Sequence, residues 1–479
     1  MLFNSLDFAI FLPLVFLTYW FVFARQLKAQ NLWVVIVSCV FYAWWDWFFL
    51  VLMMLSSVIE FVVGLAIAKT HNRQKRRLYL GVSLVLNLGM LCYFKYVNFF
   101  IDNFNQAFRI FGSSFSIDAL NVILPVGISF YTFQTISYSI DVYRRQLKPT
   151  HDFVAFMAFV TFFPQLVAGP IERATHLLPQ FYKKRHFDIA LAKDGLRQIL
   201  WGLFKKMVIA DSCAQLVNAD YAHFTTLSGS SLLIASALFA IQIYGDFSGY
   251  SDIAIGVARL FGFQLMRNFA FPYFSRSIAE FWRRWHISLS TWFRDYIYFP
   301  MGGSRGSRWQ SLRNVFVLFL ISGFWHGANW TFVSWGALNA LLFIPGLIWK
   351  NKQQISNTVA ENTYLPSLLE SWQMLRTFLL CTLTWVFFRA ENSDKALQIL
   401  AKIVAIGSWQ NPHFQAYPLL FMLVLFFGIE WLGRQKQHPL EHLQRHYNKA
   451  LRWSIYSFLI CCIWMYLPSE QSPFIYFQF

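Results

Sequence analysis

The sequence predicts an all-α, polytopic integral membrane protein. Hydrophobic residues make up 57% of the chain and charged residues only 13%, which is about half the charged share of a typical soluble protein. Aromatic residues reach 20%, so too few polar side chains exist to cover a water-facing surface. We therefore expect a single membrane domain over residues 1–479 rather than several soluble domains.

Apolar runs of spanning length recur along the whole chain. A hydrocarbon core of about 30 Å needs about 20 apolar residues per crossing. Candidate spans lie near 7–24, 31–46, 47–68, 78–96, 120–140, 153–170, 198–217, 231–250, 314–331, 332–349, 372–388, 415–432 and 453–467. Because some of these runs are short or interrupted, we expect about 11 or 12 crossings, with the remaining pieces re-entrant or interfacial.

The basic residues are concentrated in short loops between the apolar runs. The chain carries 40 Lys and Arg against 23 Asp and Glu, a formal net charge of +17. The clusters are His71–Arg77, Arg144–Lys148, Lys183–His186, Arg305–Arg313, Lys350–Lys352 and Arg434–His438. This spacing is typical of the positive-inside rule, which orients a protein in the lipid bilayer. We therefore expect the N-terminus on the outer side and no nucleic-acid partner.

The cysteines do not predict a disulfide framework or a metal site. All six lie within apolar stretches, and no CxxC spacing occurs among them. Cysteines in this setting are usually small core side chains. No metal ligand is therefore expected.

One charged segment breaks the pattern of apolar spans. Ser277–Gly303 reads SIAEFWRRWHISLSTWFRDYIYFPMGG, which is too charged to cross a bilayer. At helical period, one stripe is aromatic or apolar and holds Trp282, Trp285, Leu289, Trp292 and Tyr296. A second stripe is polar and holds Glu280, Arg284, Ser288, Thr291 and Asp295. The pattern predicts an interfacial or half-inserted amphipathic helix, with Glu280 and Arg284 paired at i,i+4.

His326 is the strongest candidate for a catalytic residue. It lies in the segment SGFWHGANW inside an apolar run. An ionisable group is costly to bury in the membrane, so its presence there indicates a functional role. Ser322 and Asn329 are spaced to share its helix face and fix its tautomer. Gly323 and Gly327 would let another backbone or a thin substrate approach. A neutral buried imidazole suits a general base. The alternative is a hydrogen-bonded core histidine that stabilises helix packing.

His286 is the second candidate. Arg283 and Ser290 are spaced to lie on its side of the amphipathic helix, and Arg284 adds a second adjacent positive charge. Neighbouring arginines disfavour a protonated imidazole and favour an anionic ligand such as a phosphate. The alternative is that the arginines bind lipid headgroups, with His286 as a bystander.

Two further segments are polar or aromatic where apolar or charged residues are expected. YGDFSGYSD, Tyr244–Asp252, ends an apolar span and predicts irregular backbone that is buried or lines a cavity. As part of the wall of a reaction channel that contacts substrate, Asp246 or Asp252 would orient a histidine or pair with an arginine. The alternative is a polar cluster that joins helices. The tail SPFIYFQF, residues 472–479, is uncharged and aromatic. Either it is an interfacial anchor, or its Tyr476 hydroxyl enters the active site as a nucleophile.

Several motifs together resemble one family. WHGANW and FWRRWHISLSTWFRDYIYFPMGG look like the membrane-bound O-acyltransferase family, and most like the bacterial branch that supplies acetyl groups to alginate and peptidoglycan. GISFYTFQTISYSIDVYR, FFPQLVAGPI and DFSGYSDIAIGVARLFGF match that branch in order and spacing. The resemblance covers most of the chain.

The resemblance implies a fold and a set of site residues. The fold is a ring of tilted helices around a central tunnel, with the core catalytic region at about 120–349 of this sequence. His326 matches the catalytic histidine of the family, and His286 matches the second histidine of the branch. Tyr476 resembles a C-terminal tyrosine that is thought to carry the acyl group in related systems.

Together, these features and the resemblance predict a protein that transfers acetyl groups across the bacterial inner membrane. Acetyl-CoA is the expected donor, with no bound cofactor, and its phosphates would lie near Arg283, Arg284, Arg294 or the loop at 305–308. Either His286 or Asn329 would hold the donor or stabilise the oxyanion. A separate periplasmic SGNH-type subunit is expected to complete transfer to a polysaccharide such as alginate or peptidoglycan. The alternatives are a lipid or protein O-acyltransferase of the same superfamily and a non-catalytic acetyl or polymer transporter.

Overall fold

The computed structural model describes residues 1–112, 115–166, 169–348, 358–411, 416–467 and 474–475. Throughout these ranges the regular structure is helical and contains no strand, which confirms the predicted all-α class. The chain divides into two compact units. The first comprises Met1–Ala192 and Val257–Met266, and the second comprises Lys193–Gly256 and Arg267–Phe479.

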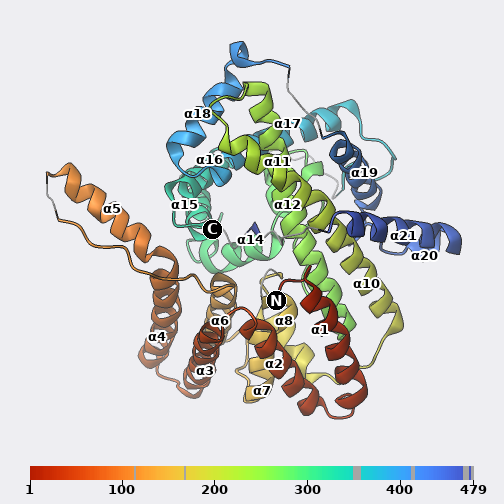
Figure 1. Ribbon diagram of the computed structural model, residues 1–479. Coiled ribbons are helices and arrows are strands. Elements are labelled where there is room, and N and C mark those ends of the chain that lie inside the picture. Colours follow the sequence, from red (N-terminus) through yellow and green to blue (C-terminus); the bar gives the residue numbers. More distant parts are fainter. Residues whose placement is uncertain (113–114, 167–168, 349–357, 412–415, 468–473, 476–479) are drawn as a thin grey trace. The chain divides into compact units, whose positions relative to one another are not determined.

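The first unit is built from helices α1 to α9 and the start of α10. Their bounds are α1 Leu6–Leu17, η1 Thr18–Val22, α2 Leu27–Ala43, α3 Trp47–Lys69, α4 Arg73–Leu91, η2 Cys92–Tyr96, α5 Val97–Ile110, α6 Ile128–Tyr143, α7 Phe153–Thr161, α8 Phe163–Leu166, α9 Ala174–Leu177, η3 Leu178–Tyr182 and α10 Ile189–Leu203. Helices α3, α4 and α6 lie side by side (Figure 1).

A buried carboxylate joins these three helices. Glu60 on α3 accepts hydrogen bonds from Ser83 and Asn87 on α4 at 2.7 and 2.5 Å and from Ser139 on α6. A buried polar group is tolerated when its hydrogen bonds are made inside the protein. These buried hydrogen bonds therefore connect α3 with α4 and α6.

Several helices have the length and composition of membrane spans. The longest apolar ones are α3, the continuous run Arg73–Ile110, α12 and α16. Shorter apolar helices are Leu6–Val22, α2, Phe153–Leu166 and α19. Large apolar side chains on their outer faces are exposed, for example Phe21, Val51 and Val85. This outward apolar surface is the one expected of helices solvated by lipid. The expected total of about 11 or 12 crossings remains a prediction.

The second unit contains the remaining helices, except that the end of α12, residues 257–260, belongs to the first unit. Their bounds are η4 Phe204–Ala210, α11 Asp211–Ala222, α12 Gly229–Leu260, η5 Pro272–Phe274, α13 Ile278–Arg284, α14 Ile287–Phe293, η6 Arg294–Tyr298, α15 Arg308–His326, α16 Trp330–Ile348, α17 Leu368–Arg389, α18 Ser393–Val404, η7 Ile406–Ser408, α19 Tyr417–Gly433, α20 Leu443–His446 and α21 Lys449–Met465.

Helices α15 and α16 pack closely as a hairpin (Figure 1). A Cβ on Gly323 would lie 2.2 Å from the carbonyl oxygen of Phe332 and 3.2 Å from the Cα of Gly336. A Cβ on Gly336 would in turn lie 2.4 Å from the carbonyl oxygen of Phe319. Glycine is therefore required at both positions for the backbones to approach. The predicted close approach at Gly323 serves helix packing in this hairpin.

Three predictions about local structure are wrong. The predicted span at 120–140 is shortened, because no helix covers 115–127 and α6 begins after Gly127, whose φ is 73°. The predicted helix over Ser277–Gly303 is broken between Arg284 and Ile287. The segment Tyr244–Asp252 is regular helix inside α12 rather than irregular backbone.

Candidate active site

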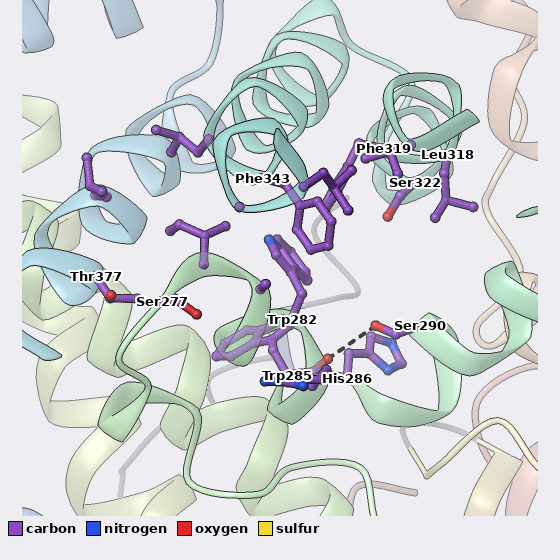
Figure 2. Close-up of a pocket in the computed structure, with 18 of the residues that line it drawn as sticks. Ser277, Trp282, Trp285, His286, Ser290, Leu318, Phe319, Ser322, Phe343 and Thr377 are labelled. Carbon is purple, nitrogen blue, oxygen red and sulfur yellow. Dashed lines mark hydrogen bonds between the residues drawn. The ribbon is translucent and has the colours of Figure 1, made fainter. Parts of the chain in front are cut away.

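A pocket of 1710 Å³ lies in the second unit among α13, α14, α15, α16 and α17. Both candidate histidines, His286 and His326, line it. Figure 2 shows Trp282 beside the labelled aromatic residues of the wall, with His286 and Ser290 together on one side. The pocket therefore combines an apolar wall with the two histidines that the sequence singled out.

His326 is the last residue of α15 and is held by aromatic rings. Its side chain is 4% exposed. Its ring centroid lies 5.2 Å from that of Trp335 on α16 and 5.3 Å from that of Phe388 on α17, with Trp325 at 4.9 Å. Ser322, one turn earlier on the same helix, also lines the pocket. The predicted placement of Ser322 and His326 along one helix is confirmed.

Asn329 does not share that helix. Helix α15 ends at His326, and Gly327 has extended backbone with φ −164° and ψ 152°. The side chain of Asn329 donates to the carbonyl of Glu391 at 3.0 Å and accepts from the backbone N–H of Thr331 at 3.0 Å. Its amide therefore caps the start of α16, and the prediction that it shares a helix face with His326 is wrong. Asn329 does not line the pocket.

His286 lies at the break between α13 and α14. Its φ is 44°, a left-handed conformation that is uncommon for a residue other than glycine. The side chain is 1% exposed, and its ring stands edge-on to Phe247 with centroids 4.6 Å apart. The break at this residue ends the continuous stripes predicted for one amphipathic helix. Arg283 and Ser290 nevertheless line the same pocket as His286.

Burial keeps His286 neutral. Loss of solvent lowers the pKa of its imidazole from 6.5 to about 3, because burial penalises the charged form. The sequence predicted that the adjacent arginines would disfavour the protonated imidazole. In the structure, the pKa is lowered by the loss of solvent instead. At physiological pH the ring is therefore uncharged and can accept a proton or a hydrogen bond.

Asn268 is a neighbour of His286 that the sequence did not single out. It is fully buried, and its Oδ1 lies 3.0 Å from the Nδ1 of His286. It follows α12 in a stretch without regular structure and belongs to no recognisable catalytic motif. No local pattern relates it to a histidine that follows 18 positions later, so the sequence carried no signal for this contact.

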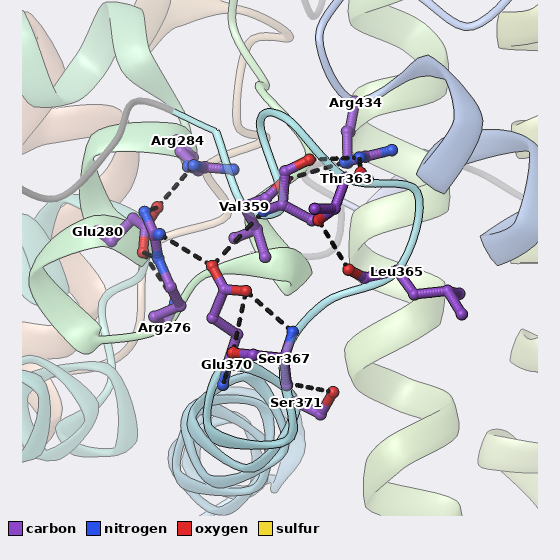
Figure 3. Close-up of polar contacts among 11 residues, drawn as sticks. Arg276, Glu280, Arg284, Val359, Thr363, Leu365, Ser367, Glu370, Ser371 and Arg434 are labelled. Atoms are coloured by element: carbon purple, nitrogen blue, oxygen red, sulfur yellow. Dashed lines mark hydrogen bonds and ion pairs between the residues drawn. The ribbon is translucent and has the colours of Figure 1, made fainter.

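The arginines of this region fall into two groups. Arg284 donates to Glu280 at 2.6 Å, which confirms the predicted i,i+4 pair, and it does not line the pocket. Arg276 also lines the pocket, but its guanidinium binds both Glu280 and Glu370, at 3.0 and 3.3 Å (Figure 3). In the second group, exposed arginines line the pocket: Arg283, Arg294 and Arg376. Only this second group presents exposed guanidinium groups to an anionic ligand in the pocket.

Glu370 connects this charged cluster to the start of α17. It accepts from the backbone N–H of Ser367, and the Ser367 hydroxyl accepts from the backbone N–H of Glu370, which forms a capping box. Arg434 holds the loop before this helix by donating to the carbonyls of Val359 and Thr363 (Figure 3). These contacts fix the end of α17 that borders the pocket.

The ion pairs of Asp246 and Asp252 are made with lysines rather than with an arginine or a histidine. Asp246 pairs with Lys206 at 2.8 Å, and Asp252 pairs with Lys205 at 2.5 Å. Both lysines lie on η4, which is a π-helix, and neither aspartate lines the pocket. These aspartates and lysines form a polar cluster that joins α12 to η4, which is the alternative that the sequence left open.

The C-terminal tail is described only at Phe474 and Ile475. Phe474 is fully buried with its ring 4.5 Å from that of Tyr250, and the backbone N–H of Ile475 donates to Asp246 at 2.7 Å. These two residues fold back onto α12. Tyr476 lies outside the described residues, so its expected role remains a prediction.

The side chains present favour acid–base chemistry on an anionic or polar substrate. Within the part of the chain that the structure describes, no group of three or more His, Cys, Asp or Glu is placed to hold a metal ion. The pocket instead offers imidazoles, hydroxyls and guanidinium groups beside an apolar wall. Such a set suits a substrate with an apolar arm and a negatively charged part.

Comparison with known proteins identifies the family. Residues 144–388 match MBOAT, the membrane-bound O-acyltransferase family. The chain is 40% identical to the probable alginate O-acetylase AlgI of Pseudomonas aeruginosa, over 89% of this chain and 81% of that protein. It is 36% identical to the probable alginate O-acetylase AlgI of Pseudomonas putida, over 98% of each chain.

A third relative has a different named substrate. The chain is 34% identical to the peptidoglycan O-acetyltransferase of Helicobacter pylori, over 98% of this chain and 95% of that protein. The family match and these full-length similarities agree with the all-helical structure and its apolar helices. The chain belongs to the membrane-bound O-acyltransferase family and is a membrane-embedded acyltransferase.

Proposed function

We propose that this acyltransferase takes acetyl groups from acetyl-CoA on the cytoplasmic side of the bacterial inner membrane for O-acetylation of a cell-envelope polysaccharide. The relatives that match over most of the chain are named for acetylation of alginate and of peptidoglycan. The observation that carries the proposal is the arginine-lined pocket in which His286 and His326 both lie.

His326 is the proposed general base. Its position between aromatic rings at the end of α15 gives it a fixed orientation on the pocket wall. It takes the proton of an incoming hydroxyl while the oxygen attacks the thioester carbonyl. The C–S bond of the tetrahedral intermediate then breaks, and the thiolate recovers the proton from the imidazolium. The products are an acetyl ester and the free thiol of CoA.

The exposed arginines are the proposed site for the donor phosphates. Arg283, Arg294 and Arg376 line the pocket, and a guanidinium binds a phosphate through paired hydrogen bonds. Arg284 is less suited to this role, because it is buried and does not line the pocket. Arg294 is exposed, and its guanidinium also pairs with Asp295 at 2.8 Å. The apolar wall with Trp282 and Phe343 would accommodate the pantetheine arm and the acetyl methyl.

The acetyl group leaves toward the outer side in this proposal. Tyr476 is a candidate for the first acceptor, because the residues just before it fold back beside Phe247, which contacts His286. An acetyl-tyrosine facing outward would then pass its acetyl group to a separate periplasmic SGNH-type transferase. That partner would complete the transfer to the polysaccharide.

Acetyl transfer can be measured directly. The purified protein is incubated with acetyl-CoA labelled in the acetyl group, and a strain lacking the gene is compared with its parent for ester-linked acetate. We expect label on the protein and a loss of acetate from secreted polysaccharide or from peptidoglycan. Label that enters lipid alone, with both polymers unchanged, would instead support a lipid acyltransferase.

A further inference from the structure

We propose that Asn268 is a positioning residue that holds His286 in the tautomer with its proton on Nδ1 and its lone pair on Nε2. The inference rests on the proposed function only in giving His286 a part in the reaction. It makes His286 a hydrogen-bond acceptor toward the reacting groups. A donor role toward the oxyanion is excluded while the ring is neutral.

The backbone of Asn268 runs along the break between α13 and α14. Its carbonyl accepts from the backbone N–H of Ile287 at 2.9 Å, and the backbone N–H of Ala270 donates to the carbonyl of Arg284 at 2.9 Å. These two hydrogen bonds flank His286 on both sides. A left-handed residue other than glycine is strained and persists only where its surroundings enforce it. The hydrogen bonds of the segment around Asn268 hold His286 in this conformation.

The atom of Asn268 that faces the histidine is an oxygen. The backbone N–H of Ser288 donates to it at 3.4 Å, and the hydroxyl of Ser288 donates at 2.9 Å. A backbone N–H has no acceptor capacity, so the amide NH₂ group would be repelled there. The NH₂ group instead donates to the hydroxyl of Ser251 at 3.1 Å. The network therefore fixes which way the amide points.

The orientation of the amide decides the tautomer of His286. Nδ1 lies 3.0 Å from an oxygen that accepts hydrogen bonds, so Nδ1 must carry the hydrogen. A neutral imidazole has one hydrogen, and Nε2 therefore holds the lone pair. Nε2 then accepts from a hydroxyl of the acceptor or from an amide N–H of the donor arm. Histidines at active sites commonly have their tautomer set by a hydrogen bond to the other ring nitrogen.

The kinetic test compares Asn268→Ala in two backgrounds. In the native sequence, we expect kcat/KM for acetyl transfer to fall by about 10- to 100-fold, the size of loss typical of a misplaced reacting group. In a His286→Ala background, the same substitution should change the rate by less than about 2-fold, because the residue it positions is gone. Equal losses in both backgrounds, or no loss in either, would overturn the proposal.

Two further variants separate positioning from folding. Asn268→Asp keeps an oxygen at Nδ1, so it should retain activity, but its carboxylate should raise the pKa of His286 and move the acidic limb of the rate profile upward by about 1 to 3 pH units. Ser236→Ala removes a buried hydroxyl elsewhere on α12, bonded to Tyr221 and away from the pocket, and it should leave the rate profile unchanged. A rate profile in Asn268→Asp identical to that of the native protein would count against the proposal.

A spectroscopic measurement tests the tautomer without any activity. Imidazole ¹⁵N signals distinguish protonated from unprotonated ring nitrogens, and His286→Gln identifies the signals of His286 in protein labelled with ¹⁵N-histidine. We expect the Nδ1–H form in the native protein and a mixture in Asn268→Ala. A native spectrum with the proton on Nε2 would refute the inference. Absence of acetyl transfer in a protein with the Nδ1–H signature would instead refute the proposed function.

Discussion

The imidazole of His326 meets the indole of Trp335 at 88°, with ring centroids 5.2 Å apart. Trp335 also stacks on Trp385 at 5.5 Å, and Phe388 closes the cluster at 5.3 Å from His326. The last turn of α15 thus presents its histidine against rings from α16 and α17. This cluster of His326, Trp335, Trp385 and Phe388 fixes the orientation of the proposed general base.

Substitution of His326 tests its catalytic role. His326→Ala should abolish acetyl transfer while the protein remains folded, because the proposed proton acceptor is removed from the pocket wall. Labelled acetyl transfer and size-exclusion chromatography report the two properties. His223→Ala, in an exposed histidine at the end of α11, is the matched control and should transfer normally. Near-native transfer by His326→Ala would remove His326 from the mechanism.

The buried neutral His286 predicts a pH dependence of stability. Its pKa falls from 6.5 to about 3 on burial, so the unfolded state takes up a proton first as the pH drops. The contribution of His286 to the free energy of unfolding is therefore fully present above about pH 6.5 and is lost progressively below it. At pH 5 the loss from this residue is about 2 kcal/mol. Thermal unfolding at pH 7.5 and pH 5 measures the loss. His286→Gln should show a smaller loss, and equal losses would mean that His286 titrates normally.

The crossing of α15 and α16 depends on glycine. In Gly323→Ala, the new methyl would lie 2.2 Å from the carbonyl oxygen of Phe332, and overpacking of this kind costs about 1–3 kcal/mol. Because α15 ends in His326, transfer activity should fall with stability. Gly428→Ala on α19 is the control, since nothing lies within 4 Å of its added methyl. Melting temperatures that match in the two variants would contradict the close crossing.

The buried ion pairs of η4 should matter more than a surface pair. Lys206→Met leaves Asp246 and Asp211 without their common partner, which contacts each at 2.8 Å. Removing one member of a buried pair costs about 3–5 kcal/mol. Lys395→Met breaks an exposed i,i+4 pair with Glu391 and should leave stability unchanged. Urea unfolding followed by tryptophan fluorescence would report both, and equal midpoints would argue against a stabilising role for the buried pairs.

The arginines of the pocket should affect donor binding more than chemistry. Arg376→Met should raise KM for acetyl-CoA with little change in kcat, since the lost contact is to a part of the donor that does not react. Arg452→Met on α21, an arginine outside the pocket, is the charge-matched control. Initial rates over a range of donor concentrations separate the two constants. An unchanged KM in Arg376→Met would place the phosphates elsewhere.

The sequence by itself determined the class of fold, and it singled out His286 and His326, the two histidines that line the pocket. Composition and the length of apolar runs act locally, since each run must be buried in lipid or protein whatever its neighbours are. The helices α3, α12 and α16 accordingly lie close to the predicted spans. The ion pair of Glu280 and Arg284 was also predictable, because both residues lie on one helical turn.

Only the tertiary structure decided the partners of the buried polar groups. Asp246 and Asp252 bind lysines of η4, Asn329 caps α16, and Asn268 holds His286 at a break in the helix. Each of these contacts except the cap joins residues that are distant in sequence. A buried polar group is satisfied by whichever donor or acceptor the packing brings near it. Its partner is therefore set by how the helices cross rather than by the local pattern of residues.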